Sequence, residues 1–239
     1  MPMAITRTLV STRALTLAVT LVLTLAGIAA MATDAAAQAT VVVEDWSKHQ
    51  VGATGIPSGW KAQSWGSPKN DFQVVAEGAE RALHMRCNDD GSTISKEIKV
   101  DIKQHPVLQW KWKATVLPKG ADSRHKASDD QAAQIYVTFP RFPTAVRSRI
   151  IGYVWDTTAP VGLTIPSEKT GTVTYVIVRS GPGELGKWMS ESRNVYEDYK
   201  RIYKEEPGEQ VGAISIASDC NDVHDRAESF MGPILFKKP

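Results

Sequence analysis

The sequence predicts an all-β protein: an antiparallel, jelly-roll-like β-sandwich with one short amphipathic helix near residues 195–205. Two observations predict this fold. Most segments alternate apolar and polar residues with a period of two, which is typical of strands with one buried face. Eight or more such segments follow one another, separated by Gly, Pro, Asn and Asp clusters and without helices between them. That order favours a sandwich over alternating strands and helices.

The N-terminal segment, residues 1–37, predicts a secretory signal peptide. Two arginines precede the apolar run of residues 14–30, and small residues follow it, so cleavage is expected after Ala37 or Ala39. The alternative is an uncleaved membrane anchor, because the run approaches the ~20 residues that span a bilayer. We expect a periplasmic or secreted protein. After cleavage, residues 40–239 are expected to form a single β-sandwich domain with no membrane span.

The charge balance argues against one class of function. The formal net charge is +2, and the signal segment contains two arginines and one aspartate, so its removal leaves +1. A general nucleic-acid binder needs clustered Lys and Arg along one face, so no nucleic-acid partner is expected. The stretch RFPTAVRSR, with Arg141, Arg147 and Arg149, is locally basic. It is interpreted as a solvated loop.

Two of the expected strands show the alternation most clearly. In residues 107–116 the even-numbered positions are apolar, and we assign Trp110 and Trp112 to the core on this basis. In residues 133–139 the odd-numbered positions are apolar and the even-numbered ones are polar. Further strands are expected over residues 81–87, 92–100, 149–156, 172–180, 211–218 and 229–236.

One segment has helical spacing instead. Asn194 can cap the helix, and Glu197 lies three residues on, as in a capping box. Pro207 and Gly208 end it. The apolar stripe is formed by Val195, Tyr199, Ile202 and Tyr203.

Several segments resemble a known family. They are WMSESRNVYEDYKRIYKEEP, residues 188–207, together with SDDQAAQIYVTF, GYVWD, VRSG and SDCNDVHDRAESFMGPILF. These segments resemble the bacterial domain-of-unknown-function family 3047. The resemblance implies a secreted or periplasmic protein with a jelly-roll sandwich akin to carbohydrate-binding modules, and it implies no activity. Cys220 departs from the family pattern, in which a small polar residue is expected at this position.

The polar phases of the strands suggest a binding face. Amide, hydroxyl and cationic groups beside aromatic rings suit a sugar polymer, and Lys and Arg favour an acidic glycan. In the alternative interpretation, Tyr153 and Trp155 fill the core and the polar side chains are ordinary solvated residues. The candidate ligand-binding residues are Gln109, Lys111, Lys113, Gln134, Tyr136, Trp155, Arg179 and Arg193.

Acidic residues at two strand ends suggest a second kind of site. Asp129 and Asp130 precede one strand, and Asp219 and Asp222 follow another, so their carboxylates can converge as oxygen ligands for a structural calcium ion. No other cofactor is expected. In the alternative interpretation, the adjacent acids cap a turn with backbone bonds or pair with Arg193.

The usual catalytic motifs are absent, and no residue is assigned a catalytic role. We expect a binding protein for a carbohydrate or a cell-envelope component. Two alternatives remain open. One is a polysaccharide-active enzyme, a lyase or glycosidase, that uses Glu191 with the aspartates as paired carboxylates. The other is a structural or assembly protein of the envelope.

The chain has two cysteines, Cys87 and Cys220. Cys87 ends its expected strand and Cys220 follows its own, each in phase with the apolar positions, so the two can meet inside the sandwich. An even cysteine count in an exported protein is compatible with a structural disulfide. The alternative is two buried free thiols, because phase does not place two strands side by side.

Overall fold

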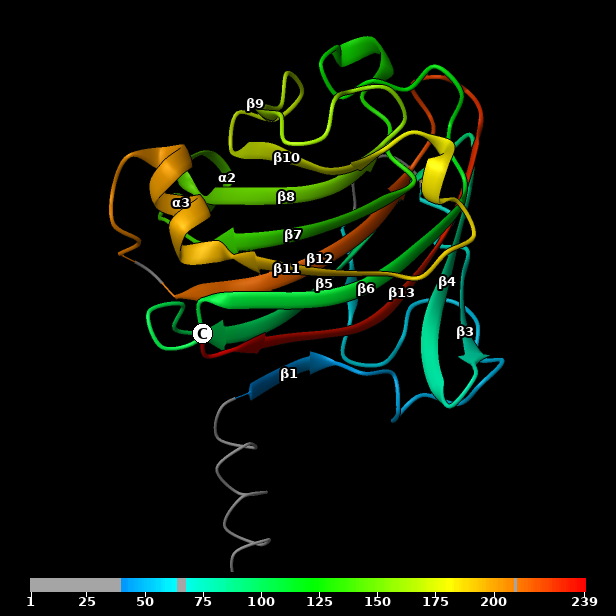
Figure 1. Ribbon diagram of the computed structural model, residues 1–239, viewed down its shortest axis with the longest axis horizontal. Coiled ribbons are helices and arrows are strands. Elements are labelled where there is room, and N and C mark those ends of the chain that lie inside the picture. The colour runs from blue at the N-terminus through cyan, green and yellow to red at the C-terminus, as the bar shows by residue number, and fades with distance from the viewer. Residues whose placement is uncertain (1–39, 64–67, 209) are drawn as a thin grey trace, which may run out of the picture. The chain divides into compact units, whose positions relative to one another are not determined.

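The computed structural model describes residues 40–63, 68–208 and 210–239. These residues form two β-sheets packed face to face, and the predicted β-sandwich is confirmed (Figure 1). The predicted signal peptide, residues 1–37, lies outside the described residues. Within the described ranges, no helix is long and apolar enough to cross a membrane.

The first sheet, sheet A, has six strands in the order β11-β6-β13-β4-β3, and β1 also pairs with β13. All of its strand pairs are antiparallel. Its strands are β1 (Thr40–Glu44), β3 (Phe72–Glu77), β4 (Glu80–Asn88), β6 (Val107–Val116), β11 (Met189–Asn194) and β13 (Arg226–Lys237).

The second sheet, sheet B, has seven strands in the order β2-β5-β12-β7-β8-β10-β9. β8 and β10 are parallel, which differs from the antiparallel expectation, because the chain returns through β9 before β10 begins. The other described pairs of this sheet are antiparallel. Its strands are β2 (Lys61–Ala62), β5 (Gly91–Val100), β7 (Ala133–Phe139), β8 (Arg149–Asp156), β9 (Thr164–Pro166), β10 (Val173–Ser180) and β12 (Val211–Asp219).

The core lies between the sheets and is rich in aromatic residues. Trp110 of β6 stacks on Tyr153 of β8 with ring centroids 5.3 Å apart. Trp112 lies against Trp155 at 5.9 Å. The assignment of Trp110 and Trp112 to the core is therefore confirmed, because both rings are buried between the two sheets.

The predicted helix is α3 (Val195–Tyr203), and it begins as expected. The Asn194 side chain accepts a hydrogen bond from the backbone N–H of Glu197 at 3.1 Å. α3 lies beside the short helix α2 (Thr144–Arg147) at one end of sheet B (Figure 1). Two 3₁₀ turns, Lys126–Ser128 and Pro182–Glu184, complete the helical segments of the described residues.

A disulfide joins the sheets. Cys87 of β4 is bonded to Cys220, which follows β12, and their Cα atoms are 6.1 Å apart. Because β4 belongs to sheet A and β12 to sheet B, the bond connects the two layers directly.

Candidate functional site

The predicted binding face does not exist as one surface. Gln109, Lys111 and Lys113 lie on β6 of sheet A, whereas Gln134 and Tyr136 lie on β7 of sheet B. Each set points away from the core, so the two sets face opposite sides of the sandwich. The prediction that they share a surface was wrong, because alternation identifies the outward face of a strand but not the sheet that contains the strand.

Three members of the predicted face are covered. Trp155 is 1% exposed because its phase on β8 turns it toward Trp112 in the core. Gln134 is buried and accepts a hydrogen bond from the Tyr136 hydroxyl. Tyr136 packs against a small apolar cluster that includes Tyr175. Trp155 therefore fills the core, as in the alternative interpretation, and is not part of a binding face.

The remaining two predicted residues hold carboxylates. Arg179 bonds Glu191 at 2.7 Å, and Trp112 donates to the same carboxylate at 3.0 Å. Arg193 bonds Asp198 at 2.7 Å rather than either member of the Asp129–Asp130 pair. The Glu191 carboxylate is therefore engaged by Arg179 and by the Trp112 indole.

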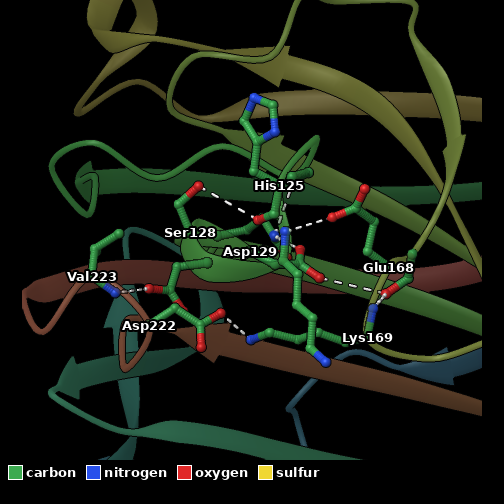
Figure 2. Close-up of polar contacts among 12 residues, drawn as sticks. His125, Ser128, Asp129, Glu168, Lys169, Asp222 and Val223 are labelled. Atoms are coloured by element: carbon green, nitrogen blue, oxygen red, sulfur yellow. Dashed lines mark hydrogen bonds and ion pairs between the residues drawn. The ribbon is translucent and has the colours of Figure 1, made fainter.

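The adjacent acids Asp129 and Asp130 are buried where they precede β7. Figure 2 shows Asp129 among its polar contacts. Asp129 accepts hydrogen bonds from Gln131 at 2.7 Å and from the Tyr175 hydroxyl at 3.2 Å. Asp130 accepts from the backbone N–H of Val223 at 2.8 Å. Asp130 thus holds the loop after β12 against the start of β7, as in the capping alternative.

The other two predicted acids join this cluster around a lysine. Figure 2 shows the ion pair between Lys169 and Asp222. Burial and then the charge of Asp130 raise the pKa of Asp219 to about 8. Burial opposes the positive charge of Lys169, but the bond to Asp222 and the other carboxylates outweigh it and raise the pKa of Lys169.

The cluster does not match a calcium site. Among the described residues, no group of three or more His, Cys, Asp or Glu side chains is arranged to hold a metal ion. The ammonium of Lys169 supplies positive charge to Asp222 instead. Asp129, Asp130, Asp219 and Asp222 therefore form a buried ionic cluster with a lysine, and the calcium hypothesis was wrong for this reason.

A different region has the geometry of a ligand site. A cavity of about 790 Å³ opens at the end of sheet B, bounded by α2, the starts of β8 and β10, β9 and the end of α3. Its lining contains five cationic residues and no Asp or Glu. We call it the basic pocket. The cations are Arg141, Arg147, Arg149, Arg201 and Lys204.

The cations of the basic pocket are only partly compensated. Glu205 forms ion pairs with Arg141 at 2.9 Å and with Arg149 at 3.2 Å. Arg147 and Lys204 form no ion pair with any carboxylate that the structure describes, and both are exposed. The pocket therefore offers positive charge to an incoming anion.

Neutral groups complete the lining. Three threonines contribute hydroxyls: Thr164, Thr172 and Thr174. The guanidinium of Arg149 lies over the Tyr203 ring, 4.4 Å from its centroid. The Tyr203 hydroxyl donates to the backbone carbonyl of Ile150 at 3.1 Å, which fixes the ring against β8.

The sequence contained part of this site. Arg141, Arg147 and Arg149 form the basic stretch that was interpreted as a solvated loop, and the structure shows that they line a pocket. Arg201 and Lys204 lie within the helix predicted near residues 195–205, and no local pattern links them to that stretch. The pairing of β8 with β10 and the packing of α3 against β8 bring these segments together, and neither can be recognised in the sequence.

The fold and the site define a two-sheet β-sandwich protein with a cationic pocket at one end. Residues 58–235 match the model of a family described as "Protein of unknown function (DUF3047)". The chain belongs to this family, and the resemblance noted in the sequence is confirmed. No curated protein matches the chain.

Several solved structures are similar at low sequence identity. A family 30 carbohydrate-binding module of a Clostridium thermocellum cellulosomal cellulase has a TM-score of 0.44 and 10% identity, covering 83% of this chain and 97% of that one. The xyloglucanase domain of NopAA from Sinorhizobium fredii has a TM-score of 0.41 and 8% identity, with coverage of 81% and 100%. Similarities of this size carry no conclusion about the ligand of this chain.

Proposed function

We propose that this chain is an exported binding protein whose basic pocket holds an acidic carbohydrate of the cell envelope. One observation carries the proposal: five cations and no carboxylate line a cavity of about 790 Å³. A cavity of this size is typical of small-molecule sites and accommodates a short stretch of sugar units.

The lining suits both parts of such a ligand. Guanidinium groups bind carboxylate, sulfate or phosphate oxygens with charge-assisted hydrogen bonds. The threonine hydroxyls can bond sugar hydroxyls. A neutral glycan lacks the anionic oxygens that gain most from guanidinium and ammonium groups, so the pocket favours acidic sugars.

Binding is the activity that the geometry supports. The described lining contains no Asp, Glu, His or Cys side chain, which are the groups that most often transfer protons or attack a substrate. The predicted catalytic candidate Glu191 is held by Arg179 and is not part of this lining.

Two features support export. The sequence of residues 1–37 has the pattern of a signal peptide. The Cys87–Cys220 disulfide is of the kind that persists in oxidising compartments such as the periplasm.

Charge reversal tests the proposal. Arg147→Glu combined with Lys204→Glu should lower the affinity for a uronic-acid oligosaccharide at least roughly tenfold, because two uncompensated cations become anions. Isothermal titration calorimetry measures the affinity. Lys48→Glu is the matched control, since Lys48 is exposed and does not line the pocket. Equal affinity in the double variant and the control would overturn the proposal. A wild-type protein that binds no acidic glycan would instead favour an assembly role.

A further inference from the structure

Two large apolar side chains project into solvent beside the basic pocket. Phe142 is 86% exposed and Val146 is 72% exposed. Phe142 lies in the turn before α2, and Val146 lies on α2 itself. Residues 141–147, which we call the tip, therefore end in an apolar point that the described part of the chain does not cover.

The tip is flanked by positive charge. Arg141 and Arg147 are its first and last residues, and Val146 shares the pocket lining with Arg149 and Lys204. Phe142 and Val146 thus lie among cationic side chains, whereas Val161, another exposed valine, does not line the pocket. Val161 is 63% exposed but lies outside the pocket lining, and single exposed valines of this kind are normal.

Apolar and cationic groups in this arrangement match the chemistry of a membrane surface. An exposed aromatic ring gains free energy when it enters the boundary between headgroups and acyl chains. Lys and Arg beside it are attracted to anionic headgroups, and their attraction adds to that of the apolar side chains. Phe142 presents a large apolar ring to solvent, and insertion into a lipid interface removes that ring from water.

We propose that the tip docks on an anionic lipid surface, with Phe142 and Val146 entering the interface and the cations of the basic pocket contacting the headgroups. This docking places the mouth of the pocket at the membrane. Only the identity of the ligand rests on the proposed function. With the tip docked, the acidic carbohydrate in the pocket is the headgroup of a membrane-borne molecule rather than a free polymer.

Vesicle co-sedimentation tests the docking. The full chain is incubated with vesicles of phosphatidylcholine containing a minority of phosphatidylglycerol, and with vesicles of phosphatidylcholine alone. We expect binding to the anionic vesicles only, and we expect it to decrease as salt rises. Phe142→Ser combined with Val146→Ser should weaken that binding about tenfold or more, because the apolar contribution is lost. Val161→Ser is the matched control and should bind as the wild type does.

A second measurement locates the contact. In a Phe142→Trp variant, brominated lipid should quench the added indole fluorescence relative to the wild type, because bromine quenches only at short range. A Val161→Trp variant should show no added quenching. Equal quenching in the two variants would contradict insertion of the tip.

The outcomes separate the docking from the proposed function. If Phe142→Ser alone, at a residue outside the pocket lining, keeps its affinity for a soluble uronic-acid oligosaccharide and loses vesicle binding, both proposals are supported. If the wild type binds the oligosaccharide but no anionic vesicle, the docking is overturned and the proposed function stands. If it binds vesicles but no oligosaccharide, the proposed function fails and the docking stands. Unchanged vesicle binding by the double variant overturns the docking.

Discussion

The guanidinium of Arg149 lies over the ring of Tyr203, with 4.4 Å between its central carbon and the ring centroid. Arg149 begins β8 and Tyr203 ends α3, so this contact joins sheet B to the helix that closes the basic pocket. The ring therefore holds one of the cationic groups in place in the lining of the basic pocket.

Substitutions of Tyr203 separate the ring from its hydroxyl. Tyr203→Ala removes the surface beneath Arg149 and should weaken binding of an acidic oligosaccharide roughly tenfold. Tyr203→Phe keeps the ring and loses the contacts of the hydroxyl with Ile150 and Thr174, so it should retain most of the affinity. Calorimetric titration distinguishes the two. Equal losses in both variants would mean that the ring does not position Arg149.

Gly152 should tolerate no side chain. A Cβ atom at this position would lie 2.8 Å from Cε1 of Tyr136 and 3.1 Å from Cδ1 of Tyr175, closer than packed carbon atoms approach. Gly152→Ala should therefore lower the free energy of unfolding by about 1–3 kcal/mol in a denaturant titration. Combining it with Tyr136→Ala should give a smaller loss than the sum of the two single variants, because the clash is removed. Additive losses would count against the close approach.

Asp219 should make the protein less stable as the pH rises. Burial and the charge of Asp130 raise its pKa in the folded state to about 8, from 3.8. Between pH 3.8 and about pH 8 the folded chain therefore holds a proton on Asp219 that the unfolded chain releases. The free energy of unfolding consequently falls as the pH rises toward 8. The stabilising contribution of the proton is complete below about pH 4 and is lost as the pH passes the folded pKa.

Asp219→Asn removes that dependence. The neutral amide cannot ionise beside Asp130, so the variant should have a flatter pH profile and a melting temperature a few degrees above the wild type at pH 9. Glu97→Gln serves as the control, because the Glu97 side chain is 79% exposed and should leave the slope unchanged. If the melting temperature of the wild type rose between pH 5 and pH 8, and Asp219→Asn abolished that rise, the raised pKa of Asp219 would be contradicted.

The disulfide should contribute to stability through the unfolded chain. Cys87 and Cys220 are 133 residues apart, and closing a loop of this length contributes up to about 4–5 kcal/mol in the chain-entropy model. A Cys87→Ala, Cys220→Ala variant should thus unfold at a lower denaturant concentration. Reductant should lower the midpoint of the wild type in the same direction and leave the variant unchanged. A wild type insensitive to reductant after complete thiol release would contradict this contribution.

The sequence predicted the strands whose burial alternates strictly. In β6 and β7 most apolar positions are buried in the core, since a half-buried strand imposes a period of two on its residues. Val116, the last residue of β6, is the exception and is exposed. β11, with the sequence MSESRN, was missed. It is an edge strand in which half-buried and exposed positions alternate, so few apolar residues mark it.

The site could not be predicted in the same way. Alternation shows which way a side chain points relative to its own strand, but it does not show which strands are neighbours, so Lys111 and Tyr136 were wrongly placed on one surface. The basic pocket combines Arg149 of β8 with Arg201 of α3, more than fifty positions apart in the sequence. Such a site follows from tertiary contacts that no local pattern encodes.

The central claim is that the basic pocket selects acidic sugars, and a comparison of two ligands tests it most directly. The wild-type chain is titrated with a uronic-acid oligosaccharide and with the same oligosaccharide after its carboxylates have been reduced to alcohols. Because only the charge and the oxygen acceptors differ, we expect the acidic ligand to bind at least about tenfold more tightly, with an advantage that shrinks as salt is added. Equal affinities for the two ligands, unaffected by salt, would contradict the claim.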